Sequence, residues 1–221
     1  MVDGTARWNT PVVPAEILRR LTEAYDPLAI LVYGSYADGT CGPDSDFDAL
    51  VLTDGGQTGH DVSFVGGVQL DVFVYPAGYF DGPFDPGQFP QLSEAVLLLD
   101  RDGRGKTLVE RVRKWQAEQR PPAREALRAQ VAWCRKMLRR TERGDPEGMF
   151  RWHWLLTDSL EICCNLLGVL YRGPKKSLLW LKVTCPEGYE RYAAALARLD
   201  AAALEGWVTW LEELSAEGEK E

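Results

Sequence analysis

The 221-residue chain has few of the features that would place it in a protein class at first sight. It lacks the run of roughly 18 apolar residues that a membrane-spanning helix needs, and its N-terminus has no signal-peptide pattern. Its charge is not basic: 25 Lys and Arg against 33 Asp and Glu give a net charge of −8, whereas proteins that bind nucleic acids normally present a basic surface. These absences predict a cytoplasmic protein whose partners include neither a membrane nor a nucleic acid.

Cysteine and histidine are also scarce. The 5 cysteines form no Cys-x-x-Cys pair, and with 2 histidines the chain offers no zinc site of the usual kind. An odd number of scattered cysteines is typical of reduced thiols. Cys134, Cys163 and Cys164 stand among apolar residues at helical spacing, so we expect them to pack in a core. The negative net charge is compatible with a small cationic substrate, and equally with a surface charged for solubility.

The first part of the chain alternates between strand and helix patterns. Short apolar runs rich in β-branched residues end in turn residues, which is typical of strands. Such runs occupy residues 28–35, 46–53, 62–76 and 95–100, the third with a Gly-Gly turn inside it. Apolar residues at helical spacing precede these runs at 14–25 and follow them at 106–119. Residues 37–45 are turn residues, and the stretch between the second and third runs is predicted as a loop.

Beyond residue 119 the pattern is helical throughout. Apolar residues recur at three- and four-residue spacing in segments separated by Gly and Pro: 122–143, 147–171, 175–184 and 187–214. The tail 215–221 is expected to fray. This change of pattern predicts an α+β protein of two domains. Residues 1–118 would form a mixed β-sheet flanked by helices, and residues 119–221 an all-α helical bundle.

Two aspartates stand on a predicted strand, where this residue type is unfavourable. Asp46 and Asp48 point to the same face of the strand, while Phe47 points to the other. Two neighbouring carboxylates repel unless a divalent cation lies between them. Asp71 is a third acid among apolar strand residues, and a neighbouring strand would bring it beside this pair. Three oxygen donors without His or Cys nearby favour Mg²⁺.

A second group of functional residue types ends the strand before these aspartates. Gly34 at a strand end lets the backbone approach a phosphate closely. The hydroxyl of Ser35 and exposed backbone N–H groups are suited to hold the phosphate oxygens. A phosphate cradle next to a metal-binding strand indicates a metal ion that carries a nucleoside triphosphate.

Other motifs explain these residues less well. The aspartate spacing at 44–48 imitates the first ligands of an EF-hand, but Ala49 stands where that motif needs Gly and Gly55 where it needs Glu. Residues 105–107, Gly-Lys-Thr, imitate the end of a P-loop, but Asp100 takes the place of its first Gly. A hairpin with surface aspartates is hard to reconcile with their apolar neighbours.

The order of these residues resembles the signature of the DNA polymerase β-type nucleotidyltransferase superfamily. The residues that carry the resemblance are Gly34, Ser35, Ala37, Gly39, Ser45, Asp46, Asp48 and Asp71. The string is similar to the small bacterial branch of that superfamily, which contains antibiotic nucleotidyltransferases of the kanamycin and lincosamide types and minimal nucleotidyltransferases. A strand followed by Asp-Arg-Asp-Gly and then by a helical bundle is the organisation of the antibiotic-modifying members.

The resemblance implies an enzyme that transfers a nucleoside monophosphate by a two-metal mechanism, with ATP or another nucleoside triphosphate as donor. Asp46 and Asp48 would hold Mg²⁺ and the triphosphate, and Asp71 would complete the metal site near the attacking hydroxyl. The Gly34-Ser35 pair and Ser45 would contact the nucleotide. The acceptor would be a small hydroxyl-bearing molecule, such as an aminoglycoside- or lincosamide-like antibiotic, and pyrophosphate would be released.

The same resemblance implies that the general base is a glutamate of the helical domain. Asp158 and Glu161 lie on the flank of the helix predicted at 147–171, where they would border a cleft and orient or deprotonate the acceptor. An ion pair on the helix surface, with Arg151 or another basic residue, explains these two carboxylates better.

Two lysines and a histidine of the helical half also carry side chains that could serve a function. Lys175 and Lys176 begin a helix, where they would reach triphosphate oxygens or form a solvated helix start. His153 lies too close to Arg151 for the Arg and His spacing expected of the helical partners of minimal nucleotidyltransferases. A ribonuclease role is therefore disfavoured.

Two functions of other classes stay open. A regulatory or antitoxin protein of the minimal-nucleotidyltransferase type would modify or bind a protein partner. A non-catalytic module would bind Mg-ATP without turnover, although the intact set of three acids speaks against it. A homodimer is compatible with the resemblance, since related enzymes sometimes build their cleft between two subunits, but no residue of the sequence shows it.

Overall fold

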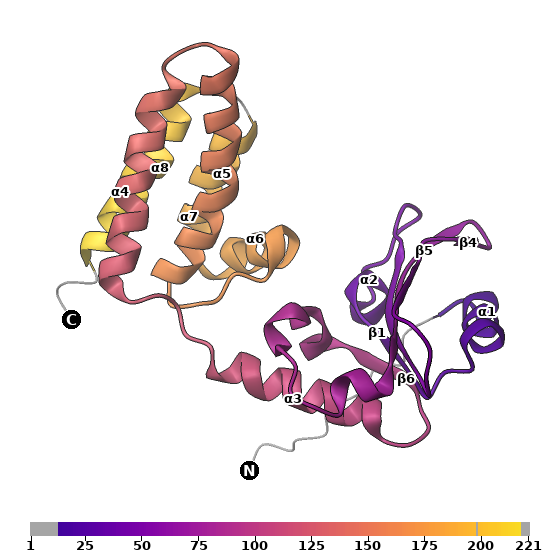
Figure 1. The fold of residues 1–221 in the computed structure, drawn as a ribbon. Coiled ribbons are helices and arrows are strands. Elements are labelled where there is room, and N and C mark those ends of the chain that lie inside the picture. The colour runs from indigo at the N-terminus through magenta and orange to yellow at the C-terminus, as the bar shows by residue number, and fades with distance from the viewer. Residues whose placement is uncertain (1–12, 198, 218–221) are drawn as a thin grey trace. The chain divides into compact units, whose positions relative to one another are not determined.

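A computed structural model of the chain describes residues 13–197 and 199–217. The chain divides into two compact units, Met1–Glu118 and Gln119–Glu221. All strands of the described residues lie in the first unit, and the described part of the second is helical (Figure 1). Within the described ranges, no helix is both long and apolar enough to cross a membrane.

The N-terminal unit is built on one mixed sheet, as the sequence predicts. The strand order is β3–β5–β2–β1–β6, and β4 pairs with β5 outside this path. The strands are β1 (Ala29–Val32), β2 (Phe47–Thr53), β3 (Gly59–Asp61), β4 (Phe64–Val65), β5 (Val68–Pro76) and β6 (Val96–Asp100). The pair β2–β5 is parallel, and the other pairs among the described strands are antiparallel. The parallel pair brings two segments that are distant in the sequence side by side.

Helices cover both faces of this sheet because its central strands are apolar on both sides (Figure 1). Helix α1 (Ala15–Tyr25) buries Ile17 against alternate residues of β1, β2 and β5. Helix α3 (Arg104–Glu118) packs Leu108 against the opposite face of β1 and β2. Each fully buried aliphatic side chain contributes about 2 kcal/mol. The even-numbered residues of β5 face α1, as their alternation predicts, so the odd-numbered Asp71 projects from the other face.

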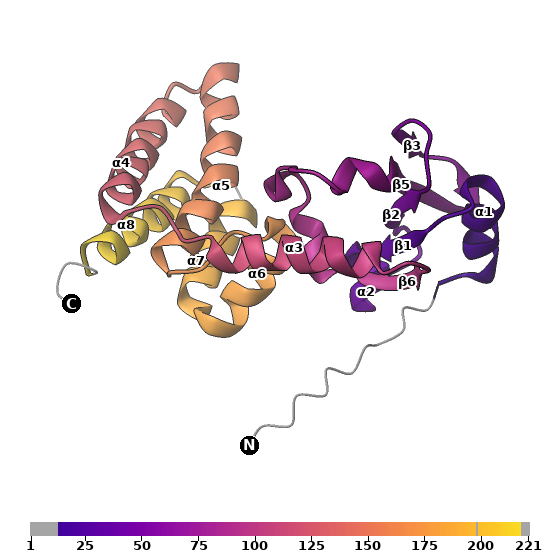
Figure 2. The same cartoon turned by 60° about the horizontal axis from the view of Figure 1, so that its bottom comes forward.

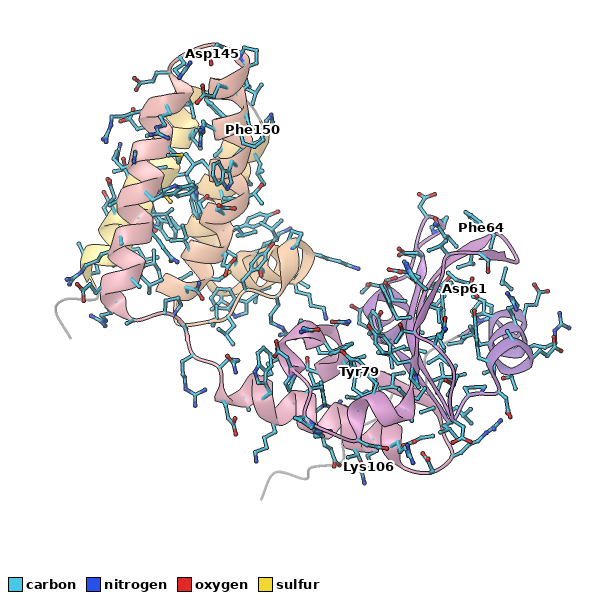
Figure 3. The ribbon with its side chains drawn as sticks, in the orientation of Figure 1. Asp61, Phe64, Tyr79, Lys106, Asp145 and Phe150 are labelled. Carbon is cyan, nitrogen blue, oxygen red and sulfur yellow. The ribbon has the colours of Figure 1, made fainter. Side chains whose placement is uncertain are left out.

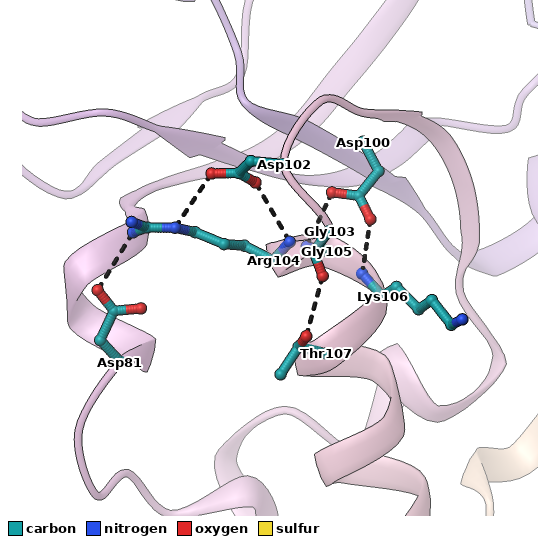
Figure 4. A network of polar contacts seen from close by, with 8 residues as sticks. All are labelled: Asp81, Asp100, Asp102, Gly103, Arg104, Gly105, Lys106 and Thr107. Carbon is teal, nitrogen blue, oxygen red and sulfur yellow. Dashed lines mark hydrogen bonds and ion pairs between the residues drawn. The ribbon is translucent and has the colours of Figure 1, made fainter.

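The first turn of α3 is held by Asp100, the last residue of β6 (Figure 4). The Asp100 carboxylate accepts hydrogen bonds from the backbone N–H groups of Gly105 and Lys106, at 3.1 and 2.9 Å. It thereby satisfies groups that have no partner within the helix. Arg104 of the same turn forms an ion pair with Asp102 at 3.1 Å. The Asp-Arg-Asp-Gly segment therefore links the end of β6 to the start of α3.

Two segments of the N-terminal unit differ from the sequence prediction. Gly34–Asp38 form a short helix, α2, where the sequence predicts a bend followed by turn residues. The stretch after β2, predicted as a loop, contains β3, which pairs with β5. Both elements are too short to show a period in the sequence. Three 3₁₀-helices connect β5 to β6: η1 (Ala77–Phe80), η2 (Pro86–Gln88) and η3 (Pro90–Glu94).

The C-terminal unit consists of five helices in its described residues. They are α4 (Arg124–Thr141), α5 (Pro146–Leu166), α6 (Gly173–Thr184), α7 (Pro186–Ala197) and α8 (Ala201–Glu217). Helices α4 and α5 pack along each other (Figure 2). Asp145, in the turn between them (Figure 3), caps α5 by accepting a hydrogen bond from the N–H of Gly148 at 2.8 Å. The core of the unit is centred on the fully buried Trp207, whose indole N–H donates to the hydroxyl of Ser159 at 2.9 Å.

Two of the predicted helical segments differ substantially from the observed helices. The segment 147–171 ends at Leu166, because Gly168 adopts a left-handed φ of 77°. The segment 187–214 is two helices rather than one: the Asp200 carboxylate accepts a hydrogen bond from the N–H of Ala202 and starts α8. Helix α8 continues into the tail that was expected to fray, and residues 218–221 lie outside the described residues.

All five cysteines are free thiols, as the sequence predicts. Cys134, Cys163 and Cys164 are buried in the helical unit, which confirms their expected place in a core.

Candidate active site

The carboxylates of Asp46, Asp48 and Asp71 converge at one end of the β2–β5 pair. Asp48 and Asp71 are register partners in this parallel pair, so their side chains project from the same face of the sheet. Asp46 directly precedes β2. One oxygen of each carboxylate lies within 4.8 Å of the others. The structure thus brings together the three acids that the sequence predicts as metal ligands.

The surroundings of Asp48 disfavour its ionised form. Burial, followed by the negative charges of Asp46 and Asp71, raises the pKa of Asp48 to about 6. A divalent cation among the carboxylates would remove this repulsion. Three carboxylate oxygens are also a donor set suited to a hard ion such as Mg²⁺. The residues present therefore fit the predicted metal, and Asp46, Asp48 and Asp71 are the residues that would hold it.

Gly34 places the start of α2 directly against Asp48. The φ of Gly34 is 66°, in the left-handed region that favours glycine. A Cβ atom at this position would lie 2.1 Å from Oδ2 of Asp48, so any other residue would displace the carboxylate. The backbone N–H of Tyr33 also donates to the carbonyl oxygen of Asp48 at 3.1 Å. Ser35 follows in the first turn of α2, and its contact with a phosphate stays a prediction.

Ser45, the third residue predicted to contact the nucleotide, belongs to the loop that leads into β2. Its hydroxyl oxygen accepts a hydrogen bond from the N–H of Gly42 at 2.9 Å, and its own N–H donates to the carbonyl oxygen of Gly42 at 3.1 Å. Both bonds hold the turn that precedes Asp46. Ser45 therefore has a structural role, and its contact with the nucleotide stays a prediction.

Two residues that lie beside the acids were not predicted from the sequence. Nε2 of His60 lies 2.5 Å from Oδ1 of Asp71. Tyr33 is 7% exposed, and burial, followed by the charges of Asp48 and Asp71, raises the pKa of its hydroxyl, which keeps it neutral. Tyr33 could have been identified from the sequence as a residue near the site, because it stands directly before Gly34. His60 could not, because its strand has three residues.

Asp158 and Glu161 of α5 line a pocket of about 430 Å³ between α4 and α5. Gln130 and Trp133 of α4 contribute an amide and an indole to the same lining. The amide oxygen of Gln130 is buried and has no hydrogen-bond partner among the described residues. The pocket therefore combines two carboxylates and an aromatic ring, both of which attract a cation.

The ion pair with Arg151 that was expected to explain these carboxylates is not formed. Arg151 instead pairs with Glu147 at 3.3 Å, and its guanidinium lies 5.2 Å from the ring of Trp154. Within the part of the chain that the structure describes, neither Asp158 nor Glu161 forms an ion pair. Whether either carboxylate acts as a base stays a prediction.

The other predicted residues of the helical unit lie on α6 and α5. Helix α6 begins at Gly173, slightly earlier than predicted, so Lys175 and Lys176 lie in its first turn. The role of these lysines at a triphosphate stays a prediction. His153 is exposed on α5.

Comparisons with known proteins bear on the N-terminal unit above all. Residues 15–116 match a family model described as nucleotidyltransferase domain. Among solved structures, a nucleotidyltransferase-like protein from Exiguobacterium sibiricum 255-15 is similar, with 13% sequence identity, a TM-score of 0.41, and coverage of 91% of this chain and 74% of that chain. No curated protein matches the chain. The match to the family model includes Gly34 and all three acids, so residues 15–116, with their mixed sheet and flanking helices, correspond to a nucleotidyltransferase domain.

Proposed function

We propose that the chain is a Mg²⁺-dependent nucleotidyltransferase that transfers AMP from ATP to a hydroxyl group of a small molecule. The observation that supports this best is the convergence of Asp46, Asp48 and Asp71 beside Gly34, within residues that match a nucleotidyltransferase domain. In the proposed reaction, the hydroxyl oxygen bonds to the α-phosphorus and the bond between the α- and β-phosphates breaks. The hydroxyl loses its proton, and pyrophosphate leaves.

Each acid has a proposed role in this reaction. Asp46 and Asp48 would bind the metal together with the triphosphate, and Asp71 would complete the metal site on the acceptor side. Bound Mg²⁺ stabilises the charge on the attacking and leaving oxygens. The backbone at Gly34 and the hydroxyl of Ser35 would hold the outer phosphates, since a glycine backbone can approach a phosphate closely.

The proposed acceptor carries positive charge as well as a hydroxyl. The net charge of the chain is −8, and the helical pocket presents Asp158 and Glu161 beside the indole of Trp133. Carboxylates and an aromatic face together attract an ammonium group. Aminoglycoside- and lincosamide-like molecules combine amines with ring hydroxyls, so an antibiotic-modifying activity is the version of the proposal to test first. The free thiols suit a reducing compartment such as the cytoplasm.

The test is pyrophosphate release from Mg-ATP with a panel of aminoglycosides and lincosamides. Asp46→Asn should lower the rate at least about 100-fold, because the metal contributes several kcal/mol to the transition state. Asp44→Asn is the matched control: this exposed aspartate lies in the same loop but outside the cluster, and its variant should keep the wild-type rate.

Two results would count against this proposal. Absence of pyrophosphate release with every nucleotide and acceptor would contradict it. Transfer of AMP to a co-purifying protein, again dependent on Asp46, would retain the chemistry but support the protein-modifying alternative. Glu161→Gln separates the two roles of the pocket: a higher KM with unchanged kcat indicates acceptor binding, whereas a lower kcat indicates a base.

A further inference from the structure

We propose that His60 is a positioning residue for Asp71: it fixes one carboxylate oxygen so that the other faces the metal. The inference rests on the proposed function, because it assumes that Asp71 binds a metal. Its starting point is the distance of 2.5 Å between Nε2 of His60 and Oδ1 of Asp71. A carboxylate has two oxygens, and a hydrogen bond to Oδ1 leaves Oδ2 for a cation.

The imidazole of His60 is itself held in place. His60 is the register partner of Phe73, and the two rings stack with centroids 4.2 Å apart and an interplanar angle of 4°. The next residue, Asp61, ties β3 to α1 by accepting a hydrogen bond from the hydroxyl of Tyr25 at 2.7 Å. A ring fixed by its strand and by a stacking partner is a suitable support for a metal-binding carboxylate.

Asp71 needs such a support more than Asp48 does. The backbone at Gly34 confines the carboxylate of Asp48, but the side chain of Asp71 is 37% exposed. An exposed aspartate moves among several rotamers, and a metal ion that captures it must overcome that freedom. The bond from His60 selects one rotamer before the metal arrives.

Two simpler roles for His60 explain the geometry less well. The first is that of a metal ligand. The described donors close enough to share one ion are the three aspartates, and Nε2 of His60 is engaged with Asp71 instead. The second is stability alone. The His60 side chain is 45% exposed, and a polar contact at this exposure contributes little to stability.

The test measures Mn²⁺ binding to the full-length chain by electron paramagnetic resonance of the free ion. His60→Phe retains a ring to stack on Phe73 but removes the hydrogen bond. It should weaken Mn²⁺ binding by about 10- to 100-fold. His60→Gln places an amide N–H near the position of Nε2 and should stay within about 3-fold of the wild type. His153→Phe, which changes an exposed histidine of the helical unit, is the control and should have no effect.

The outcomes separate this inference from the proposed function. The positioning role is overturned if His60→Phe binds Mn²⁺ with wild-type affinity. It is also overturned if His60→Gln loses as much Mn²⁺ affinity as His60→Phe does. Asp46→Asn and Asp71→Asn test the metal site itself. If both bind Mn²⁺ as the wild type does, the proposed function fails together with the inference. If both lose binding and His60→Phe does not, only the inference fails.

Discussion

The backbone conformation of Gly34 and the integrity of the metal site depend on the same missing side chain. The φ of 66° disfavours any residue with a Cβ atom, and the Asp48 carboxylate occupies the place that this atom would take. Gly34 therefore serves both the start of α2 and the position of a carboxylate. The two effects can be separated, because Gly39 at the other end of α2 has a similar φ of 76° and open space around its Cα.

Gly34→Ala and Gly39→Ala should differ in metal binding more than in stability. The left-handed conformation costs an alanine about 1 kcal/mol at either position, measured as the free energy of unfolding in urea. Only Gly34→Ala also displaces Asp48, so it should lose most of its Mn²⁺ affinity while Gly39→Ala keeps it. Equal Mn²⁺ affinities in the two variants would show that the close approach at Gly34 is unimportant.

Tyr25 and Asp61 form a pair whose contribution to stability depends on pH. Burial, followed by the hydrogen bond to Asp61, raises the pKa of Tyr25 to about 12. Because the folded-state pKa is above the unfolded value of 10.0, the stabilisation is fully present below pH 10 and is lost as the pH rises towards 12.

Tyr25→Phe should therefore lower the free energy of unfolding at neutral pH by about 1 kcal/mol, a value reduced by solvent screening at this partly exposed site. The difference from the wild type should shrink between pH 10 and 12. Urea unfolding of both proteins across this range is the measurement. A difference that does not change with pH would contradict the assignment.

At the scale of elements, the sequence predicts those that are long enough to show a period or an apolar run. Helix α1 and strands β1, β2, β5 and β6 all fall within their predicted segments, because burial on one or two faces imposes the pattern. The short α2 and β3 could not be predicted, since their positions follow from packing against β2 and β5. The break between α7 and α8 was missed because apolar residues continue on both sides of it.

Two helical glycines, one in α7 and one in α8, differ in how much space their surroundings leave for a Cβ atom. A Cβ atom on Gly188 of α7 would lie 2.6 Å from the ring of Trp210, whereas Gly206 of α8 has open space around it. Gly188→Ala should destabilise the helical unit by about 1–3 kcal/mol through overpacking. Gly206→Ala should stabilise it by about 0.5–1 kcal/mol through helix propensity. Thermal unfolding followed by circular dichroism measures both signs, and a shift in the same direction for both would refute the packing argument.

At the scale of the whole molecule, the candidate site was more predictable than its surroundings. The three acids and Gly34 could be located from the sequence because metal and phosphate binding restrict residue types as well as spacing. The contact of His60 with Asp71 could not, since it depends on how β3 pairs with β5. The pocket of Asp158 and Glu161 was anticipated as a cleft border, but its lining from α4 required the structure.

The reactivity of the cysteines reports on the packing of the helical unit. Cys41 is exposed and Cys185 is partly buried, whereas Cys134, Cys163 and Cys164 are buried. Burial, followed by the charge of Asp158, raises the pKa of Cys134 to about 12, and burial also raises the pKa of Cys163 and Cys164. Since the thiolate is the reactive form, these three thiols should stay unmodified in the native protein.

Titration with a disulfide reagent at neutral pH should therefore show one fast thiol, one slower thiol, and three more after unfolding in urea. Cys41→Ser should remove the fast phase and leave the others unchanged. Rapid reaction of all the thiols without denaturant would show that the helical core is not packed as described.

The parallel pairing of β2 with β5 also concerns the lifetime of the fold. This pairing joins two groups of strands: β3 and β5 form one group, and β2, β1 and β6 form the other. Asp48 belongs to the β2 group and Asp71 to the β5 group, so a cation bound by both would link the two groups of strands. A ligand that binds the native form alone stabilises that form. The concentration of divalent cations would then set how slowly the sheet unfolds. The metal-free chain would unfold faster and would be more susceptible to proteolysis.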